Sequence, residues 1–413
     1  MSTTPGLPAR RSALRLLDAV LRRGETLAAA DRGAMQGLPA SADQALARAI
    51  AGETLRWLTD LDTLIDSATR QNLADDAKAR MVLRIMLAQA LRLGSPPHAV
   101  VATGLPLLAG GPRRLAHGVF STLLKRKVSL SDAPTLPSSV AERWGDRAPA
   151  IAAGLAEAPP LDLTLRDADQ TEEWRERLDA TSLAPGHLRL PRGAAVEKLP
   201  GFDDGAWWVQ DLAASLPARL LGSGEGRRAL DLCAAPGGKT LQLAAAGWDV
   251  TALDASDKRL GRLRENLSRT GLSAEIVVAN ALEWEAAEPF DAILLDAPCT
   301  ATGTCRRHPD VLHRIGPRQI EELAELQKQL LDRAIEMLKP SGRLLYAVCS
   351  LETQEGPDQA DRVSLRPDPI GQDELPAGLT STTQGGWVRT DPGMLSGAGG
   401  LDGFFIARWR RPT

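Results

Sequence analysis

Residues 227–254, RRALDLCAAPGGKTLQLAAAGWDVTALD, predict a strand, a helix and a second strand in succession. The alternation continues through a helix in DKRLGRLRENLSRTG, strands in EIVVAN and FDAILLD, a long helix in EELAELQKQLLDRAIEMLK and a strand in GRLLYAVC. Such alternation builds parallel sheets covered by helices. We therefore predict an α/β domain with a doubly wound, Rossmann-like sheet. The tail segment DGFFIARWR should form an antiparallel edge pair with a strand near GGWVRT.

The first 130 residues, in contrast, have helical periodicity and almost no strand pattern. In RRSALRLLDAVLRRG (residues 10–24), Leu14, Leu17, Val20 and Leu21 share one face and Gly24 ends the run. A segment rich in Pro and Ser, SDAPTLPSS, follows at 131–139 and is typical of a linker. The sequence thus predicts an all-helical bundle in front of the α/β domain.

A small mixed region is expected between the bundle and the doubly wound domain. LDLTLR (161–166) and HLRLP (187–191) alternate like half-exposed strands. Trp207 and Trp208 are interpreted as core residues in preference to a platform for stacked bases. We therefore predict three parts: a helical domain at 1–132, a small α/β connecting region at 133–215, and the doubly wound domain at 216–413.

Composition limits the possible classes of protein. The chain has 413 residues, a net charge of −3 and four cysteines without a C-x-x-C pair, so we expect free thiols and no metal site. No run of 18 apolar residues occurs, and MSTTPGLPARR lacks the apolar stretch of a secretory signal, so we expect a cytoplasmic protein without a membrane span. Residues 1–130 hold 18 Lys and Arg against 10 Asp and Glu. This basic end is a candidate surface for a polyanion, although the same charges could simply solvate helices.

The turn DLCAAPGGKT (231–240) ends like a phosphate-binding loop but departs from that pattern. The pattern requires a glycine where Cys233 stands, and we expect a cysteine not to supply glycine's conformational freedom. Pro236 also removes a backbone N–H group that a phosphate cradle would use. A nucleotide triphosphate hydrolase is therefore disfavoured, and an ATP-binding assay would test that alternative.

Polar residues at the ends of the next two strands instead indicate an adenosine site. Asp254 can accept hydrogen bonds from ribose hydroxyls, and the side-chain amide of Asn280 can contact adenine. A dinucleotide would require G-x-G-x-x-G, which is missing here, whereas S-adenosylmethionine carries no phosphate and tolerates Pro236. The alternative is that Asp254 and Asn280 only terminate strands and cap helices.

Cys299 and Cys349 follow the fourth and fifth strands of the doubly wound domain, at the same edge as the cofactor turn. If these strands are neighbours, both thiols face one pocket. Carbon-5 of a pyrimidine becomes nucleophilic once a thiolate adds to carbon-6, and a carboxyl group such as that of Asp296 can stabilise the charge that develops. A second thiol can assist loss of the carbon-5 proton. The residues alone leave open which thiol attacks.

Three motifs resemble a known family: DLCAAPGGKT, DAPCTATGTCRRHPD (296–310) and YAVCS (346–350) are similar to bacterial RNA cytosine-C5 methyltransferases of the Sun family. The helical front end resembles the antitermination factor NusB, mainly in RMVLRIMLAQALRL (80–93) and GVFSTLLKR (118–126). This fusion is similar to the small-subunit ribosomal RNA cytosine-C5 methyltransferases, over nearly the whole chain. The resemblance implies a NusB-like RNA-binding domain at 1–132 and an S-adenosylmethionine-dependent methyltransferase domain at 216–413.

The resemblance also implies roles for single residues. Cys349 would be the nucleophile, Cys299 would serve product release, and Asp296 would hold the cytosine edge close to the cofactor methyl group. The residues that would bind S-adenosyl-L-methionine are Cys233, Ala234, Ala235, Pro236, Gly237, Gly238, Lys239, Asp254, Asn280 and Asp296. The family usually has aspartate at Asn280, threonine at Val348 and P-E-E-N where this chain has LETQEG (351–356). Cys305 has no role in the pattern and is expected to pack beneath the loop.

The expected partner is RNA, most simply 16S ribosomal RNA, bound by a monomer. Arg306, Arg307 and His308 follow the Pro-Cys loop and could grip phosphates beside a flipped base, unless one arginine only pairs with Asp310. The alternatives are a non-catalytic RNA-binding assembly or antitermination factor, or a cytosine-C5 methyltransferase for another RNA such as tRNA, or for DNA.

Overall fold

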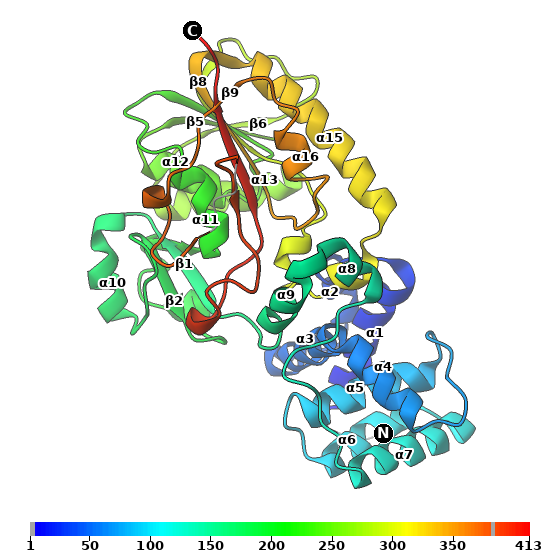
Figure 1. Cartoon of the computed structure of the whole chain (residues 1–413). Coiled ribbons are helices and arrows are strands. Elements are labelled where there is room, and N and C mark those ends of the chain that lie inside the picture. The colour runs from blue at the N-terminus through cyan, green and yellow to red at the C-terminus, as the bar shows by residue number, and fades with distance from the viewer. Residues whose placement is uncertain (1–4, 381–384) are drawn as a thin grey trace. The chain divides into compact units, whose positions relative to one another are not determined.

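The computed structural model describes residues 5–380 and 385–413, so the first four residues of the stretch searched for a secretory signal lie outside it. The chain forms two compact units, Met1–Glu157 with Cys305–Ile315, and Ala158–Thr304 with Gly316–Thr413 (Figure 1). The three-part division of the sequence stays a prediction. The helices at 138–154, which fall in the predicted connecting region, group with the first unit.

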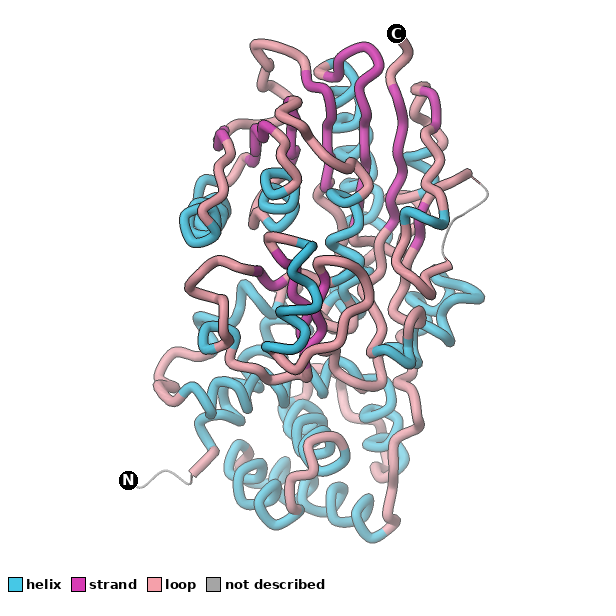
Figure 2. The backbone as a smooth tube through the Cα atoms, turned by 90° about the vertical axis from the view of Figure 1, so that its left-hand side faces the viewer, coloured by secondary structure: helices cyan, strands magenta, loops and turns pink. Residues whose placement is uncertain are grey.

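The first unit is helical, as its periodicity predicts. In Figure 2, which is coloured by secondary structure, the strands of the described residues all belong to the second unit. No helix in the described residues is long and apolar enough to cross a membrane. The helices are α1 (Leu7–Arg23), α2 (Leu27–Ala34), α3 (Ser41–Arg56), α4 (Leu58–Ser67), α5 (Lys78–Leu91), α6 (Pro97–Gly104), α7 (Gly110–Lys125), α8 (Ser138–Trp144), α9 (Ala148–Gly154) and α14 (Val311–Arg314).

Helix α1 illustrates how the pattern determines the bundle. Leu16, Leu17 and Val20 are at most 2% exposed and belong to the core of the bundle. Gly24 ends the helix in the left-handed conformation (φ 68°), where its N–H group reaches the carbonyls of Ala19 and Val20. The predicted end of this helix is confirmed, because glycine adopts this conformation without steric cost.

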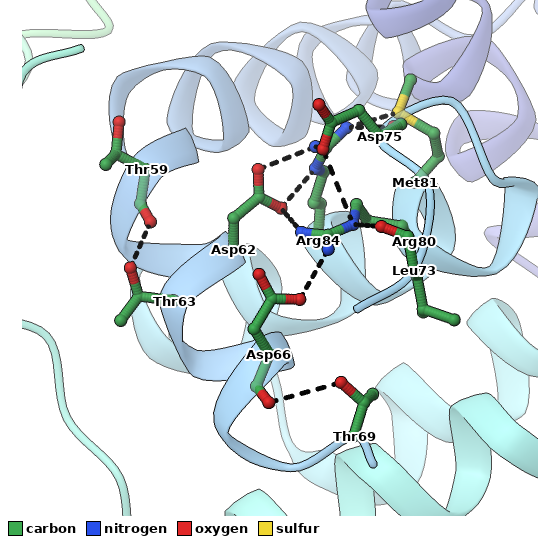
Figure 3. Close-up of polar contacts among 10 residues, drawn as sticks. All are labelled: Thr59, Asp62, Thr63, Asp66, Thr69, Leu73, Asp75, Arg80, Met81 and Arg84. Atoms are coloured by element: carbon green, nitrogen blue, oxygen red, sulfur yellow. Dashed lines mark hydrogen bonds and ion pairs between the residues drawn. The ribbon is translucent and has the colours of Figure 1, made fainter. Parts of the chain in front are cut away.

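A group of partly buried ion pairs joins α4 to α5 (Figure 3). The guanidinium of Arg84 donates to both carboxylate oxygens of Asp62 at 2.7 Å, and Arg80 pairs with Asp62 at 3.1 Å and Asp66 at 2.5 Å. The two arginine side chains are 3–4% exposed. Arginine suits this position because its planar fork matches a carboxylate bidentately.

The segment Cys305–Ile315 comes from the middle of the chain but folds with the helical unit. Arg56 at the end of α3 donates to the carbonyl oxygen of Arg306 at 3.0 Å, and Asp310 accepts from the backbone N–H of Leu27 at 3.4 Å. Nε2 of His313 lies 2.7 Å from the Leu55 carbonyl, which can only accept, so this ring nitrogen carries the proton. The chain therefore enters the helical unit a second time directly after the Pro-Cys loop.

The second unit begins with a small antiparallel sheet in the order β2-β1-β3, at the predicted strands. The expectation that these strands are half-exposed is wrong, because all of β2 and the last four residues of β1 are buried. Helix α10 (Thr171–Arg177) connects β1 (Leu161–Leu165) to β2 (His187–Leu190), and β3 is Trp207–Val209. Trp207 and Trp208 are 0% and 3% exposed, so the interpretation of both as core residues is confirmed.

The large sheet of this unit has the strand order β10-β11-β8-β7-β4-β5-β6, and β9 pairs with β11. The strands β4 to β8 are parallel, and strand order reverses between β4 and β7, which confirms the doubly wound prediction. The tail strand β11 pairs antiparallel with β10 as predicted, but it also pairs with β8 and is an inner strand. The strands are β4 (Arg228–Leu232), β5 (Asp249–Asp254), β6 (Glu275–Val278), β7 (Phe290–Asp296), β8 (Leu338–Val348), β9 (Arg366–Pro367), β10 (Val388–Arg389) and β11 (Phe405–Arg410).

Alternate residues of the large sheet pack against helices on opposite faces. On β8, Leu344 and Tyr346 share a core with α15 (Pro317–Glu336), which Figure 1 shows along the sheet, while Leu345 and Ala347 share a core with α11 and α12. These two helices are Leu212–Arg219 and Gly238–Ala245, and α13 (Asp257–Thr270) and the short α16 (Pro357–Ala360) complete the unit. Burial on both faces explains why the strands read as continuous apolar runs.

Candidate active site

The cofactor turn connects β4 to α12 and is closely packed. Gly237 has φ 108°, and a Cβ atom there would lie 2.4 Å from Cδ1 of Leu263 on α13, so only glycine fits. Cys233 also has a positive φ of 63°. The expectation that a cysteine could not take glycine's conformation at this position is therefore wrong, and it no longer counts against a phosphate loop. Pro236 still removes a donor from the turn.

Asp254, at the end of β5, holds the cofactor turn in place through a hydrogen bond to its backbone. Its carboxylate accepts from the backbone N–H of Ala235 at 3.2 Å and from that of Ser256 at 2.9 Å, and the residue is 3% exposed. Asn280 lies two residues beyond β6, is exposed, and bonds through its side chain to Glu283 and to the N–H of Leu282. Asn280 thus makes the capping contacts that were the alternative interpretation, and a contact with adenine stays a prediction.

The two cysteines predicted to face one pocket do lie together. The strands β7 and β8 are neighbours, with Asp296 opposite Ala347, and Sγ of Cys299 is 3.4 Å from Sγ of Cys349. The hydrogen bond with Cys349 raises the pKa of Cys299 well above its ordinary value, and burial raises it further. The two sulfurs are therefore within hydrogen-bond distance of each other, at the ends of neighbouring strands.

Cys233 is the third thiol at this edge of the sheet. Burial and the charge of Asp254 raise its pKa to about 12, so it stays protonated. It has the electrostatics of a packing residue and not those of a nucleophile.

Lys239 pairs with Asp296, a contact that the sequence does not reveal. Its Nζ lies 2.7 Å from Oδ2 of Asp296 and 5.4 Å from the ring centre of Phe404. Burial alone would lower the pKa of Lys239, but the Asp296 carboxylate outweighs it and raises that pKa, so the ammonium group stays charged. The site therefore holds a fixed ion pair beside the two thiols.

Glu355 is a second residue that the sequence analysis did not assign. It lies in LETQEG after β8, is 0% exposed, and accepts hydrogen bonds from Thr300 and Ser350, the residues that directly follow the two cysteines. Burial raises the pKa of Glu355, although these donors favour its charged form. The sequence did contain a signal for Glu355. It lies in LETQEG, the segment that takes the place of the P-E-E-N run of the resembled family, and both segments contain glutamate.

The three residues expected to grip RNA phosphates differ in exposure. Arg306 is 1% exposed, which corrects the expectation that its side chain is presented at the surface. Arg307 is half-buried and His308 is exposed, so these two keep their predicted role as proposals. Asp310 pairs with Arg314 at 3.1 Å, and Cys305 is fully buried, in agreement with the expectation that it packs.

Two families match this chain. Residues 218–410 match the family described as 16S rRNA methyltransferase RsmB/F, and residues 7–107 match the NusB family. The Ribosomal RNA small subunit methyltransferase B of Cronobacter sakazakii is 32% identical over 428 residues, which cover 97% of each chain. The chain belongs to the RsmB/F methyltransferase family. This membership confirms the resemblance drawn from the motifs, and it makes S-adenosyl-L-methionine the cofactor, as the sequence predicts.

Further RsmB/F relatives and solved structures agree. The methyltransferase B of Klebsiella pneumoniae is also 32% identical, again over 97% of each chain. A methyltransferase homolog from Pyrococcus horikoshii is 26% identical with a TM-score of 0.55, covering 70% of this chain and 98% of its own. The structure of NSun6 from the same organism with SFG has a TM-score of 0.58 and 20% identity over 67% of this chain and 98% of its own, which shows the fold alone.

Proposed function

We propose that this chain is a cytoplasmic enzyme that methylates carbon-5 of a cytosine in small-subunit ribosomal RNA through a covalent adduct of Cys349 with the base. The observation that carries this proposal is the 3.4 Å separation of two thiols at the ends of neighbouring strands. An amine acceptor attacks with its own lone pair and needs no thiol, whereas carbon-5 needs one to activate the ring. The ribosomal substrate follows from the names of the relatives.

Cys349 is the group that adds to the ring. Cys349 directly follows β8, and its Sγ lies 3.4 Å from Sγ of Cys299. Its sulfur forms a bond with carbon-6, and the electron pair of the carbon-5–carbon-6 double bond moves so that carbon-5 becomes nucleophilic. S-adenosyl-L-methionine, when bound, supplies the methyl group to carbon-5.

Asp296 and Lys239 hold the edge of the base. The carboxylate of Asp296 can accept from the exocyclic amine of cytosine, and the ammonium of Lys239 at 2.7 Å fixes its direction. Their charges are in place before the reaction, so no rearrangement is needed when charge develops on the ring. The same pair discriminates against uracil, which has a carbonyl in place of the amine.

Cys299 serves the release of the product. The main cause of its raised pKa is the hydrogen bond with Cys349, and that cause is gone once Cys349 has become a thioether. Cys299 can then release its own proton to solvent, and the resulting thiolate takes the carbon-5 proton and becomes a thiol again. The electrons of that C–H bond re-form the double bond, and Cys349 leaves as a thiolate.

The residues of the turn fit a cofactor without phosphate. Residues 233–239 and Asp254 would hold S-adenosyl-L-methionine, because the close packing of Gly237 on Leu263 and the bond of Asp254 to Ala235 N–H fix the turn at the carboxyl end of β4. The basic helical unit, with Arg307 and His308, would add affinity for RNA that falls as salt rises.

The test is methyl transfer from labelled S-adenosyl-L-methionine to 16S ribosomal RNA, with the product nucleoside identified by mass spectrometry. We expect 5-methylcytidine from the wild type and none from Cys349→Ser. Cys299→Ala should accumulate a covalent RNA adduct that survives denaturing gel electrophoresis, while the buried Cys305→Ala serves as the control that turns over normally. Release of methylated RNA by Cys299→Ala at the wild-type rate would contradict the assigned roles.

The same assay separates the alternatives. Methylation of tRNA or of a DNA oligonucleotide in preference to 16S RNA would show that the substrate is that nucleic acid and not 16S ribosomal RNA. Binding of RNA without methyl transfer by the wild type would favour a non-catalytic assembly or antitermination factor.

A further inference from the structure

Glu355 bonds to the residue after each of the two cysteines. Oε1 accepts from the backbone N–H of Thr300 at 2.9 Å, and Oε2 accepts from the hydroxyl of the same residue and from Ser350 Oγ at 2.5 Å. One side chain thus links the loop after β7 to the loop after β8. The residue is 0% exposed, so water does not compete for these contacts.

Gln327 of α15 extends the contact to the other side of Cys299. Its Nε2 donates to Oε1 of Glu355 at 3.0 Å and to the carbonyl of Pro298 at 2.8 Å, so Cys299 is held through the residues before and after it. Tyr346 of β8 donates to the backbone carbonyl of Glu355 at 2.6 Å and to Oε1 of Gln327 at 3.1 Å. Gln327 and Tyr346 are both 0% exposed.

The two loops depend on Glu355 to different degrees. Thr300 uses both its N–H group and its hydroxyl on this carboxylate. Ser350 keeps a contact with the N–H of Glu352 at 3.1 Å, and Cys349 directly follows the paired strand β8. Loss of the carboxylate should therefore displace Cys299 more than Cys349.

We propose that Glu355 is a positioning residue that holds Cys299 against Cys349, and that it acts mainly on the release step of the reaction. This proposal rests on the proposed function. Both sulfurs must reach one base in sequence, and an error of about 1 Å in such an arrangement costs roughly 100-fold in rate. Since Cys349 stays supported without Glu355, the adduct still forms and its breakdown slows.

The first experiment compares Glu355→Ala with Glu355→Gln. The alanine variant should turn over roughly 10-fold to 100-fold more slowly and accumulate the covalent RNA adduct, as Cys299→Ala does. The glutamine variant should retain most of the turnover, because its oxygen can accept from Thr300 N–H and Gln327 while its amide group donates to the two hydroxyls. Glu321→Ala, on the exposed surface of α15, is the matched control and should behave as wild type.

A second measurement does not depend on catalysis. Phenylarsine oxide chelates two thiols that lie close together, so the wild type should bind it with 1:1 stoichiometry at the Cys299–Cys349 pair, and Cys299→Ala should not. Glu355→Ala should bind it at least about tenfold more weakly. If the wild type makes no RNA adduct but the arsenical result holds, the proposed function fails while the positioning role stands.

A third variant covers the case in which Glu355→Ala does not fold. Gln327→Leu fills the same space but loses the contact with Pro298, and it should show the same two effects to a smaller degree. The proposal is overturned if a folded Glu355→Ala or Gln327→Leu chelates the arsenical normally, or if turnover falls without accumulation of the adduct.

Discussion

Nζ of Lys239, from the cofactor turn, lies 2.7 Å from Oδ2 of Asp296, at the end of a different strand. The pair joins the part of the site that would hold the methyl donor to the part that would hold the base. Under the proposed function, Lys239 would act at the base as well as in the cofactor turn.

We expect Lys239→Met to lower kcat about 100-fold, because Asp296 loses the cation that orients it. The two residues act as one unit, so the double variant with Asp296→Asn should lose little more than either single variant. Steady-state kinetics of the four proteins measures this, and additive losses would show that the residues act separately. Lys239→Arg keeps the charge and should retain part of the activity.

Gly237→Ala should destabilise the second unit by about 2 kcal/mol, because alanine at φ 108° is strained and its Cβ meets Leu263. Affinity for S-adenosyl-L-methionine, measured by calorimetry, should fall with it. The control is Gly261→Ala on α13, the helix that also carries Leu263. A Cβ atom at Gly261 would meet no other atom within 4 Å, so this substitution should raise the free energy of unfolding by up to about 1 kcal/mol. Equal effects of the two substitutions would contradict this prediction.

Stability should depend on pH through Asp231, at the end of β4. It is fully buried, accepts from Thr240 at 2.6 Å, and its Oδ1 has no hydrogen-bond partner in the described part of the chain. Burial raises its pKa from 3.8 to about 7. The folded state thus keeps a proton that the unfolded chain releases above pH 4, and the free energy of unfolding falls as pH rises toward 7.

Asp231→Asn removes this titration while it keeps an acceptor for Thr240. Relative to wild type, the variant should gain about 2 kcal/mol of unfolding free energy between pH 5 and pH 8. Denaturant unfolding at the two pH values measures the change, with the exposed Asp249→Asn on β5 as the control. A relative stability that does not change with pH would refute the prediction.

Two bidentate Arg–Asp pairs in the helical unit differ in burial and provide a matched comparison. Arg84 is 4% exposed and pairs with Asp62 (Figure 3), whereas Arg48 is 48% exposed and pairs with Asp31 at 2.7 Å. Arg84→Met should cost about 2 kcal/mol, because Asp62, which is 23% exposed, then keeps only its contact with Arg80, and Arg48→Met less than about 1 kcal/mol. Urea unfolding compares the two, and similar losses would mean that burial does not determine their contribution.

The sequence predicts most of the fold because strands and helices here have strong local patterns. The alternation of parallel strands with helices, the end of α1 at Gly24 and the burial of Trp207 all follow from apolar periodicity and glycine chemistry. The proximity of Cys299 and Cys349 also followed, once β7 and β8 were taken as neighbours. Family membership supports the methyltransferase assignment independently.

The errors concern residues whose conformation depends on distant segments. Cys233 takes a positive φ because the turn around it is held by Asp254 and α13, which its own neighbours in sequence do not reveal. Arg306 is polar and follows a catalytic motif, yet it is buried. Glu355 bonds to Thr300, 55 positions away, and Lys239 bonds to Asp296, 57 positions away, so neither contact can be found from local sequence.

The return of residues 305–315 to the helical unit affects how the protein is made. Leu27, Leu55 and Arg56 find their partners in that segment, so the first unit stays incomplete until residue 315 has left the ribosome. By then four of the five parallel strands, β4 to β7, have already been synthesised. Domains usually fold one after another during translation, but in this protein the first unit is completed only after most parallel strands of the second unit have been made.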